Sequence, residues 1–102
     1  MVKMNEDYVL LIKRRGICLY YDAKNEVYYY VKEGEGRLHK IADYHSRVFY
    51  PRFGYEYVLQ CYECLIGRRL LSFEIKHISE KIYEADKEQE EKENADKSEE
   101  GC

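Results

Sequence analysis

The sequence predicts an α+β fold in which two related strand-hairpin–helix motifs pack as one small domain. Alternating apolar and polar residues in both halves of the 102-residue chain indicate strands, and residues at helical spacing follow them. The run at residues 7–10 returns almost unchanged at residues 56–59, and the pair Arg14 and Arg15 is answered by Arg68 and Arg69. We therefore expect an internal pseudo-repeat with a groove between its two copies.

The first motif, at about residues 7–47, is predicted to begin with a three-stranded antiparallel meander. Residues 8–13, 17–22 and 26–32 are rich in strand-forming side chains, and turn signals with glycine or asparagine separate them. In the third strand Tyr28 and Tyr30 face one side, and Val27, Tyr29 and Val31 face the other.

A helix at residues 37–46 is expected to complete the first motif. Four residues recur there at the spacing of one helical face: Leu38, Ile41, Ala42 and His45. Residues 48–54 contain the only proline, which disfavours helix and extends the residue before it. This segment is therefore interpreted as the linker between the motifs.

The second motif, at about residues 55–83, is predicted to repeat the order of strands followed by a helix. Alternation at residues 55–62 and 70–75 indicates two strands, and Ile78, Ile82 and Ala85 supply a short helical stripe. Because each half is too small to hold a core of its own, residues 1–83 are expected to share one globular domain.

Residues 84–102 are predicted to form an acidic tail. They hold nine acidic residues against three lysines, so the tail carries −6 and the rest of the chain +3 of the net charge of −3. Two alternatives are open for this segment. It is either a solvated helix with Glu–Lys pairs four residues apart, which frays between Gln89 and Lys97, or a disordered chain.

The composition indicates an intracellular, soluble protein without a membrane span. No run approaches the roughly 20 apolar residues that a spanning helix needs, and the acidic N-terminal residues do not fit a signal peptide. The chain has twelve tyrosines, no threonine and few amides beside 36% charged residues. This combination is typical of hyperthermophile proteins.

Cys61 and Cys64 form a C-x-x-C pair for which three interpretations are open. The pair can pack as small apolar side chains, bind zinc or act as a redox couple, and a structural disulfide that includes Cys18 is a further alternative. Zinc needs four ligands, and the sequence supplies neither a second C-x-x-C nor a close histidine pair. Packing is the preferred interpretation, so neither a metal site nor a cofactor is predicted.

No set of residues in the sequence indicates catalysis. His39 and His45 lie six residues apart, which points them to different faces of the expected helix. The sequence contains no supported carboxylate pair, no nucleophile with its base and no glycine-rich phosphate loop. The chain is therefore predicted not to be an enzyme.

The length, the Glu/Lys-rich tail and a tyrosine-rich body that includes Tyr28, Tyr29 and Tyr30 carry a resemblance to a group of proteins. The chain resembles the small orphan proteins of filamentous and rod-shaped viruses of hyperthermophilic archaea, among them the Acidianus filamentous viruses. The resemblance implies a viral protein in the host cytoplasm that serves as an interaction or DNA-binding module. The chain departs from the viral DNA-binding pattern, because it lacks helix-turn-helix, C2H2 and ribbon-helix-helix signatures.

The tyrosine surplus favours a module that binds a peptide or protein segment in the groove between the motifs, as a monomer or a homodimer. Tyrosine supplies stiff contact area with a polar tip, and an extended peptide can add to a free strand edge. The expected contacts are Tyr28, Tyr30, Tyr50, Arg52, Tyr55 and Tyr57.

Nucleic-acid binding is the alternative function. Arg14, Arg15, Arg68 and Arg69 would neutralise phosphates from two equivalent turns, while exposed tyrosines stack on bases. The body charge of +3 is far below that of a strongly basic binding surface. Peptide binding is therefore the preferred prediction.

Overall fold

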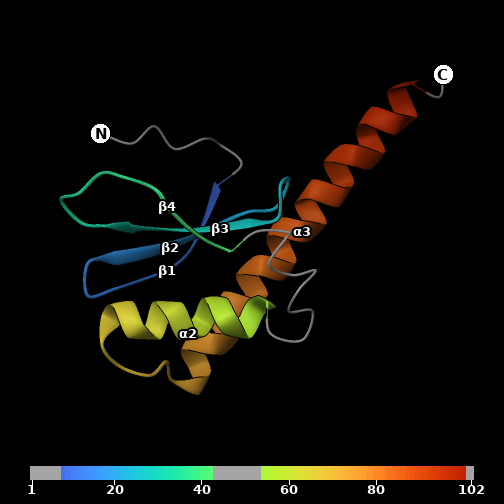
Figure 1. Ribbon diagram of the computed structural model, residues 1–102. Coiled ribbons are helices and arrows are strands. Elements are labelled where there is room, and N and C mark those ends of the chain that lie inside the picture. The colour runs from blue at the N-terminus through green and yellow to red at the C-terminus, as the bar shows by residue number, and fades with distance from the viewer. Residues whose placement is uncertain (1–7, 43–53, 101–102) are drawn as a thin grey trace.

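A computed structural model of the protein describes residues 8–42 and 54–100, which form one antiparallel sheet and two helices. The strands follow one another across the sheet in chain order: β1 (Tyr8–Arg14), β2 (Ile17–Asp22), β3 (Val27–Lys32) and β4 (His39–Ala42). The helices α2 (Gly54–Ile66) and α3 (Ser72–Glu100) come after the sheet, as Figure 1 shows. The predicted α+β class is confirmed.

The predicted three-stranded meander is also confirmed. β1 and β2 are joined by a two-residue turn in which Arg15 and Gly16 both have positive φ, 50° and 74°. This is the hairpin turn whose twist matches that of the flanking strands. The Glu33 N–H donates to the Gly16 carbonyl at 2.7 Å, which ties the turn to the end of β3.

Cross-strand pairing divides the sheet into two unlike faces, because partner residues in an antiparallel ladder share a face. One face, called the helix face below, carries Val9, Ile12, Ile17, Leu19, Tyr21, Tyr28 and Tyr30. Most of these side chains are buried. The other face, called the open face, carries two buried residues, Asp22 and Val27, and eight that are half-buried or exposed: Tyr8, Leu10, Lys13, Cys18, Tyr20, Tyr29, Val31 and Lys40.

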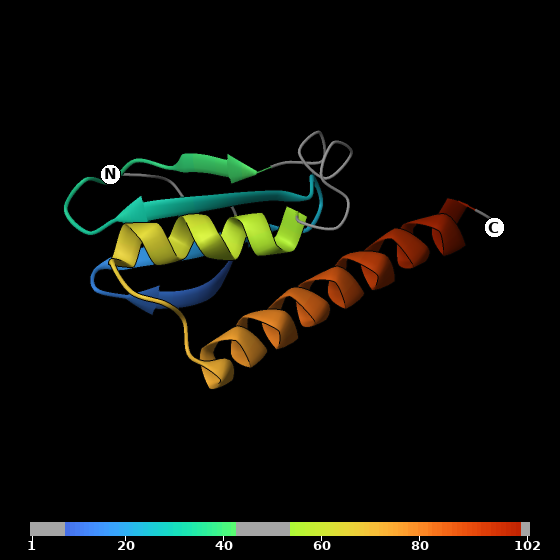
Figure 2. The same ribbon diagram turned by 60° about the horizontal axis from the view of Figure 1, so that its bottom comes forward.

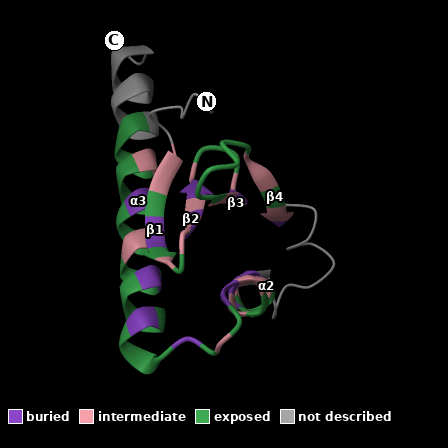
Figure 3. Cartoon of the chain, turned by 90° about the vertical axis from the view of Figure 1, so that its left-hand side faces the viewer, coloured by how far each residue is buried: buried purple, intermediate pink, exposed green. Residues whose placement is uncertain are grey.

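The two helices cover different parts of the sheet. α2 lies along the strands on the helix face and packs against β2 and β4, whereas α3 runs obliquely past β1 (Figure 2). Tyr62 of α2 is fully buried, and its hydroxyl donates to the Ile17 carbonyl at 2.7 Å. Figure 3 shows α3 at the β1 end of the sheet and no helix of the described chain over the open face.

The two strands predicted in the second motif are helices. Residues 55–62 lie in α2 and residues 72–75 in α3. The repeated runs therefore differ in structure, since residues 8–10 lie in β1 and residues 57–59 in α2, and the described residues show no internal repeat. The buried residues of α2 have helical spacing: Val58, Leu59, Tyr62 and Ile66.

The helix predicted at residues 37–46 is wrong where the structure describes it. Residues 39–42 form β4, which pairs with β3 through Tyr28, Tyr29 and Tyr30. The remainder of that predicted helix and all but the last residue of the predicted linker lie outside the described residues.

The acidic segment is helical, which is one of the two alternatives that the sequence left open. α3 continues through Glu100. Ala85 is buried, and Asp86 accepts a hydrogen bond from the Tyr21 hydroxyl at 2.6 Å. The start of the predicted tail therefore packs on the sheet, while the division into a domain at residues 1–83 and a tail stays a prediction.

Candidate binding groove

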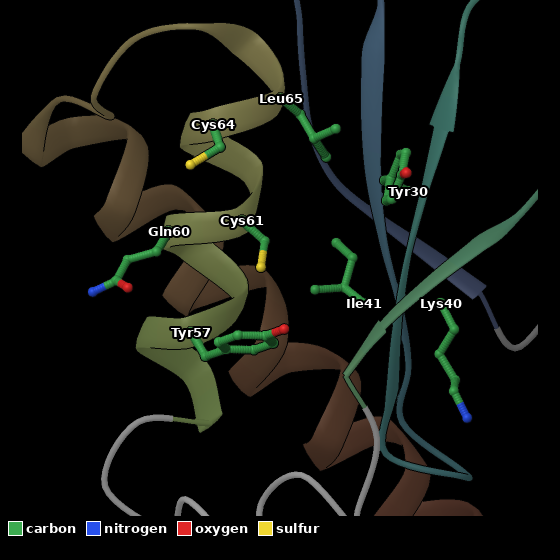
Figure 4. Close-up of a pocket in the computed structure, with 8 residues that line it drawn as sticks. All are labelled: Tyr30, Lys40, Ile41, Tyr57, Gln60, Cys61, Cys64 and Leu65. Carbon is green, nitrogen blue, oxygen red and sulfur yellow. The ribbon is translucent and has the colours of Figure 1, made fainter.

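A cavity of about 490 Å³ opens between α2 and the β4 side of the sheet. Tyr57, Cys61 and Leu65 line it from α2, and their spacing of four residues places them on one face of the helix. Tyr30 and Ile41 line it from β3 and β4. In Figure 4 the three α2 side chains point toward the sheet and Ile41 points toward α2. This cavity, called the groove below, therefore has mainly apolar and aromatic walls.

The rim of the groove is polar. Gln60 and Cys64 belong to α2 and point away from the sheet, and Lys40 of β4 points away from α2 (Figure 4). On the sheet side Tyr30 stacks on His39, with ring centroids 4.7 Å apart and an interplanar angle of 15°. The Nε2 atom of His39 lies 3.0 Å from a carboxylate oxygen of Glu35. These contacts hold the Tyr30 ring against His39.

β4 forms one edge of the sheet. It pairs with β3 on one side, and no strand of the described chain pairs with its other side. An unpaired edge presents backbone N–H and C=O groups to incoming chains. The groove thus has an edge strand on one side and an amphipathic helix on the other.

The two cysteines of the C-x-x-C pair lie within α2 rather than at its N-terminus. Cys61 is half-buried, Cys64 is exposed, and both are free thiols, as is Cys18. Their sulfur atoms point in different directions, that of Cys61 toward the groove and that of Cys64 away from it (Figure 4). Within residues 8–42 and 54–92, no group of three or more His, Cys, Asp or Glu side chains is placed to hold a metal ion.

Two of the predicted partner-binding residues meet in the groove, Tyr30 and Tyr57. Tyr28 does not, because it is 6% exposed and stacks on Tyr21 within the core, with ring centroids 4.7 Å apart. Tyr55 connects the two helices through hydrogen bonds of its hydroxyl with the Ile75 carbonyl and the Ser79 hydroxyl. The predicted contacts Tyr50 and Arg52 lie outside the described residues.

The four arginines of the alternative prediction come together at one end of the molecule, but not at two equivalent hairpin turns. Arg14 and Arg15 lie at the β1–β2 turn, whereas Arg68 and Arg69 lie between α2 and α3. Arg15 donates to the Ile66 carbonyl at 2.8 Å and so ties the hairpin to the end of α2. Three of the four guanidinium groups are hydrogen-bonded within the fold. Arg15 donates to the Ile66 carbonyl, and Arg14 and Arg68 both donate to one carboxylate.

That carboxylate belongs to Glu74, whose side chain is 1% exposed. It accepts two hydrogen bonds from Arg68, at 2.9 and 3.0 Å, and one from Arg14 Nε at 2.7 Å. The Leu71 N–H donates to it as well, at 2.9 Å, which is how a glutamate at the third helical position caps a helix start. These hydrogen bonds, from Arg68 first and from the Leu71 N–H and Arg14 as well, lower the pKa of Glu74 to about 2.

Two further polar contacts explain buried groups near the other end of the sheet. Burial and the hydrogen bond to Asp86 raise the pKa of Tyr21 far above its ordinary value. The buried carboxylate of Asp22 accepts hydrogen bonds from the Lys24 and Asn25 backbone N–H groups and from the Asn25 side chain, which closes the β2–β3 turn. The carboxylates of Asp22 and Asp86 therefore both have hydrogen-bond partners within the chain.

Sequence reasoning missed most of the groove and the role of Glu74. The signal for the groove is the spacing of Tyr57, Cys61 and Leu65. The first two of these residues lie in residues 55–62, where the alternation predicts a strand instead. The signal for Glu74 was its place three residues after Leu71, ahead of a helical stripe.

No protein family, no curated protein and no solved structure matches the chain. Within the described residues, every helix is too short or too polar to cross a membrane. The proposed function therefore rests on the geometry of the groove.

Proposed function

We propose that the protein is a non-enzymatic interaction module that binds an extended peptide or protein segment in the groove between α2 and β4. The observation that carries this proposal is the pairing of an edge strand with a helix across an apolar cavity of about 490 Å³. A cavity of this size falls within the range of about 300–1,000 Å³ that ligand sites occupy.

The binding mode follows from the chemistry of the two walls. A peptide that adds to β4 as a fifth strand satisfies the backbone groups of the edge through main-chain hydrogen bonds. Every second side chain of such a strand then points toward α2. There it meets Tyr57, Cys61 and Leu65, so bulky apolar side chains at alternate positions are preferred in the ligand.

The fixed aromatic walls add affinity. The Tyr30 ring is held by His39, and Tyr57 is 45% exposed on the facing helix. Rigid aromatic side chains in an interface lose little conformational entropy on binding, and they are common among residues that dominate binding energy. Tyr30 and Tyr57 are therefore the expected centres of recognition.

Nucleic-acid binding through the arginines gains no support from the geometry. Arg14 and Arg68 share the Glu74 carboxylate, and Arg15 donates to a helix carbonyl. A phosphate would have to displace these intramolecular partners.

The proposal is tested by peptide display against the full chain, followed by an N-methyl scan of the best peptide. Strand addition predicts that N-methylation weakens binding at every second residue only, because alternate N–H groups face β4. A peptide that bound as a helix or through side chains alone would lose this period of two. That pattern, or no enrichment of any peptide, would contradict the proposal.

Matched tyrosine substitutions locate the site. Tyr57→Ala removes one wall of the groove and is expected to weaken peptide binding by about tenfold or more. Tyr83→Ala removes a tyrosine of α3 that is 69% exposed and does not line the groove, so it should leave the affinity unchanged. Equal affinities for the two variants would place the peptide elsewhere.

A further inference from the structure

Another cavity, of about 480 Å³, opens between β1 and the start of α3, at the edge of the sheet opposite β4. Figure 3 shows α3 beside this strand. The cavity is called the edge pocket below, and its lining residues are Leu10–Arg14, Phe73, Glu74 and His77. It shares no lining residue with the groove. Its volume lies within the range of about 300–1,000 Å³ that ligand sites occupy.

The edge pocket has an apolar base and an apolar mouth. Leu11 and Ile12 are 1% and 4% exposed, so they form the base. The pairing of β1 with β2 skips Leu11, and such a bulge re-aims a side chain at the edge of a sheet. Leu10 and Phe73 are 45% and 64% exposed and lie at the mouth. The pocket can therefore take up an apolar group.

The rim of the edge pocket is basic, with Lys13, Arg14 and His77. Lys13 and His77 are exposed, and in the part of the chain that the structure describes neither side chain has an ion pair or a hydrogen bond. Arg14 donates from Nε to Glu74 and from Nη1 to the Lys13 carbonyl. Its Nη2 takes part in no hydrogen bond with the described residues. Lys13 and this nitrogen can therefore donate to a ligand.

Glu74, the acidic residue of the lining, does not cancel the positive charge. Its side chain is 1% exposed and accepts hydrogen bonds from Arg14 and Arg68. These two guanidinium groups and one carboxylate leave one positive charge, and Lys13 adds a second. The Leu71 N–H also donates to Glu74, so the start of α3 is already capped. An anion in the edge pocket would meet basic side chains.

We propose that the edge pocket binds an amphiphilic anion, which is an apolar chain or ring that ends in a carboxylate or phosphate group. The apolar part lies between Leu10 and Phe73, and the anionic head meets Lys13 and Arg14. A neutral apolar molecule would leave the basic rim unused, and a bare anion would leave the apolar base unfilled. A nucleobase is a poor fit as well, because the lining contains no amide or hydroxyl side chain to recognise it. This site is independent of peptide binding in the groove.

Titration of the full chain with octanoate and with octyl phosphate, followed by backbone amide NMR, tests the proposal. At least one of the two is expected to shift the amides of Leu10, Lys13, Phe73 and His77, and the tighter of them identifies the head group. Octanol has the chain without the charge, and acetate has the charge without the chain. Both should bind at least about tenfold more weakly than the tighter amphiphile.

Matched variants separate the apolar contact from the charged one. Phe73→Ser should weaken binding by about tenfold, whereas Tyr83→Ser, at a position of the same helix that is 69% exposed and does not line the pocket, should not. Lys13→Gln should also weaken binding, whereas Lys24→Gln, at an exposed position of the β2–β3 turn, should not. The Phe73 and Lys13 side chains make no hydrogen bond to Glu74, so both variants are expected to fold.

Several results would overturn the proposal. One is the absence of binding by either amphiphile at several millimolar. Another is equal affinity for octanol, or for acetate, which would indicate an adventitious ion only. Shifts confined to Tyr57, Cys61 and Leu65 would place the amphiphile in the groove instead. Affinities that Phe73→Ser and Lys13→Gln leave unchanged would contradict the proposal too, and none of these results would bear on peptide binding at β4.

Discussion

The two edges of the sheet differ in how a helix packs against them. At the β1 edge α3 packs against the strand, and hydrogen bonds from Arg14 and Tyr21 to Glu74 and Asp86 fix the helix at two points. At the β4 edge α2 contacts the strand, but a cavity, the groove, opens between them. A covered edge is protected against unwanted strand pairing, whereas an uncovered edge is open to it.

We expect the β1 edge to contribute to stability and the β4 edge to the proposed binding. At the β1 edge the charged residues pair with one another, because Arg14 and Arg68 both donate to the buried carboxylate of Glu74. The β4 edge presents tyrosine, isoleucine and cysteine to a cavity instead. Substitutions at the first edge should therefore affect folding, and substitutions at the second should affect binding.

The largest effect on stability is expected from Glu74→Gln. The change removes the charge that pairs with Arg14 and Arg68, and we expect unfolding free energy to fall by about 3 kcal/mol. Glu80→Gln, at an exposed position of the same helix, should change it by no more than about 0.5 kcal/mol. Urea unfolding measures both, and a Glu74→Gln loss as small as that of the control would show that the ion pairs contribute little.

The same carboxylate should make stability depend on pH. The pKa of Glu74 is about 2 in the folded protein, against 4.5 for an unperturbed glutamate. The folded state therefore binds a proton at Glu74 less tightly than the unfolded state does. The stability that Glu74 contributes is complete above pH 4.5 and is lost as the pH falls toward 2. The difference in unfolding free energy between the wild type and Glu74→Gln should shrink over this window; a constant difference would contradict the assignment.

A smaller loss is expected for Tyr62→Phe in the core between α2 and β2. It leaves the Ile17 carbonyl without its 2.7 Å hydrogen bond, at a cost of about 1–1.5 kcal/mol in unfolding free energy. Burial raises the pKa of Tyr62 to about 12. Tyr83→Phe is the control, because Tyr83 is 69% exposed. Thermal unfolding of both variants measures the difference, and equal midpoints would mean that the buried hydroxyl adds nothing.

The smallest effect on stability is expected at the groove. Tyr57→Ala removes a side chain that is 45% exposed, and alanine favours helix, so unfolding free energy should change by no more than about 1 kcal/mol. A much larger loss would mean that Tyr57 supports the fold, and the comparison between the edges would then fail.

The first half of the fold followed from the sequence because its strands alternate over six or seven residues. β4 did not, since four residues are too few to show a period and the pairing with β3 decides their structure. Its residues Ile41 and Ala42 happen to fit a helical spacing as well.

The sequence predicted strands instead of helices in the second half because a strand-like and a helical pattern overlap there. Tyr55, Tyr57, Leu59 and Cys61 alternate like a strand, but Val58, Leu59, Tyr62 and Ile66 form the helical stripe that is buried. Tyrosine obscured the choice, because it occupies exposed, half-buried and fully buried positions here. Tyr30 and Tyr57 both line the groove, and their role in binding a partner stays a prediction.

The central claim is that an extended segment binds at the β4 edge and not at the β1 edge. Backbone amide NMR of the full chain, titrated with the best displayed peptide, tests it most directly. We expect chemical-shift changes and protection from hydrogen exchange at His39–Ala42, with further shifts at Tyr57, Cys61 and Leu65 of α2. The chemical shifts and hydrogen-exchange rates of the backbone amides around Glu74 and Asp86 should stay unchanged. Shifts concentrated on β1 and α3, with β4 unaffected, would contradict the account.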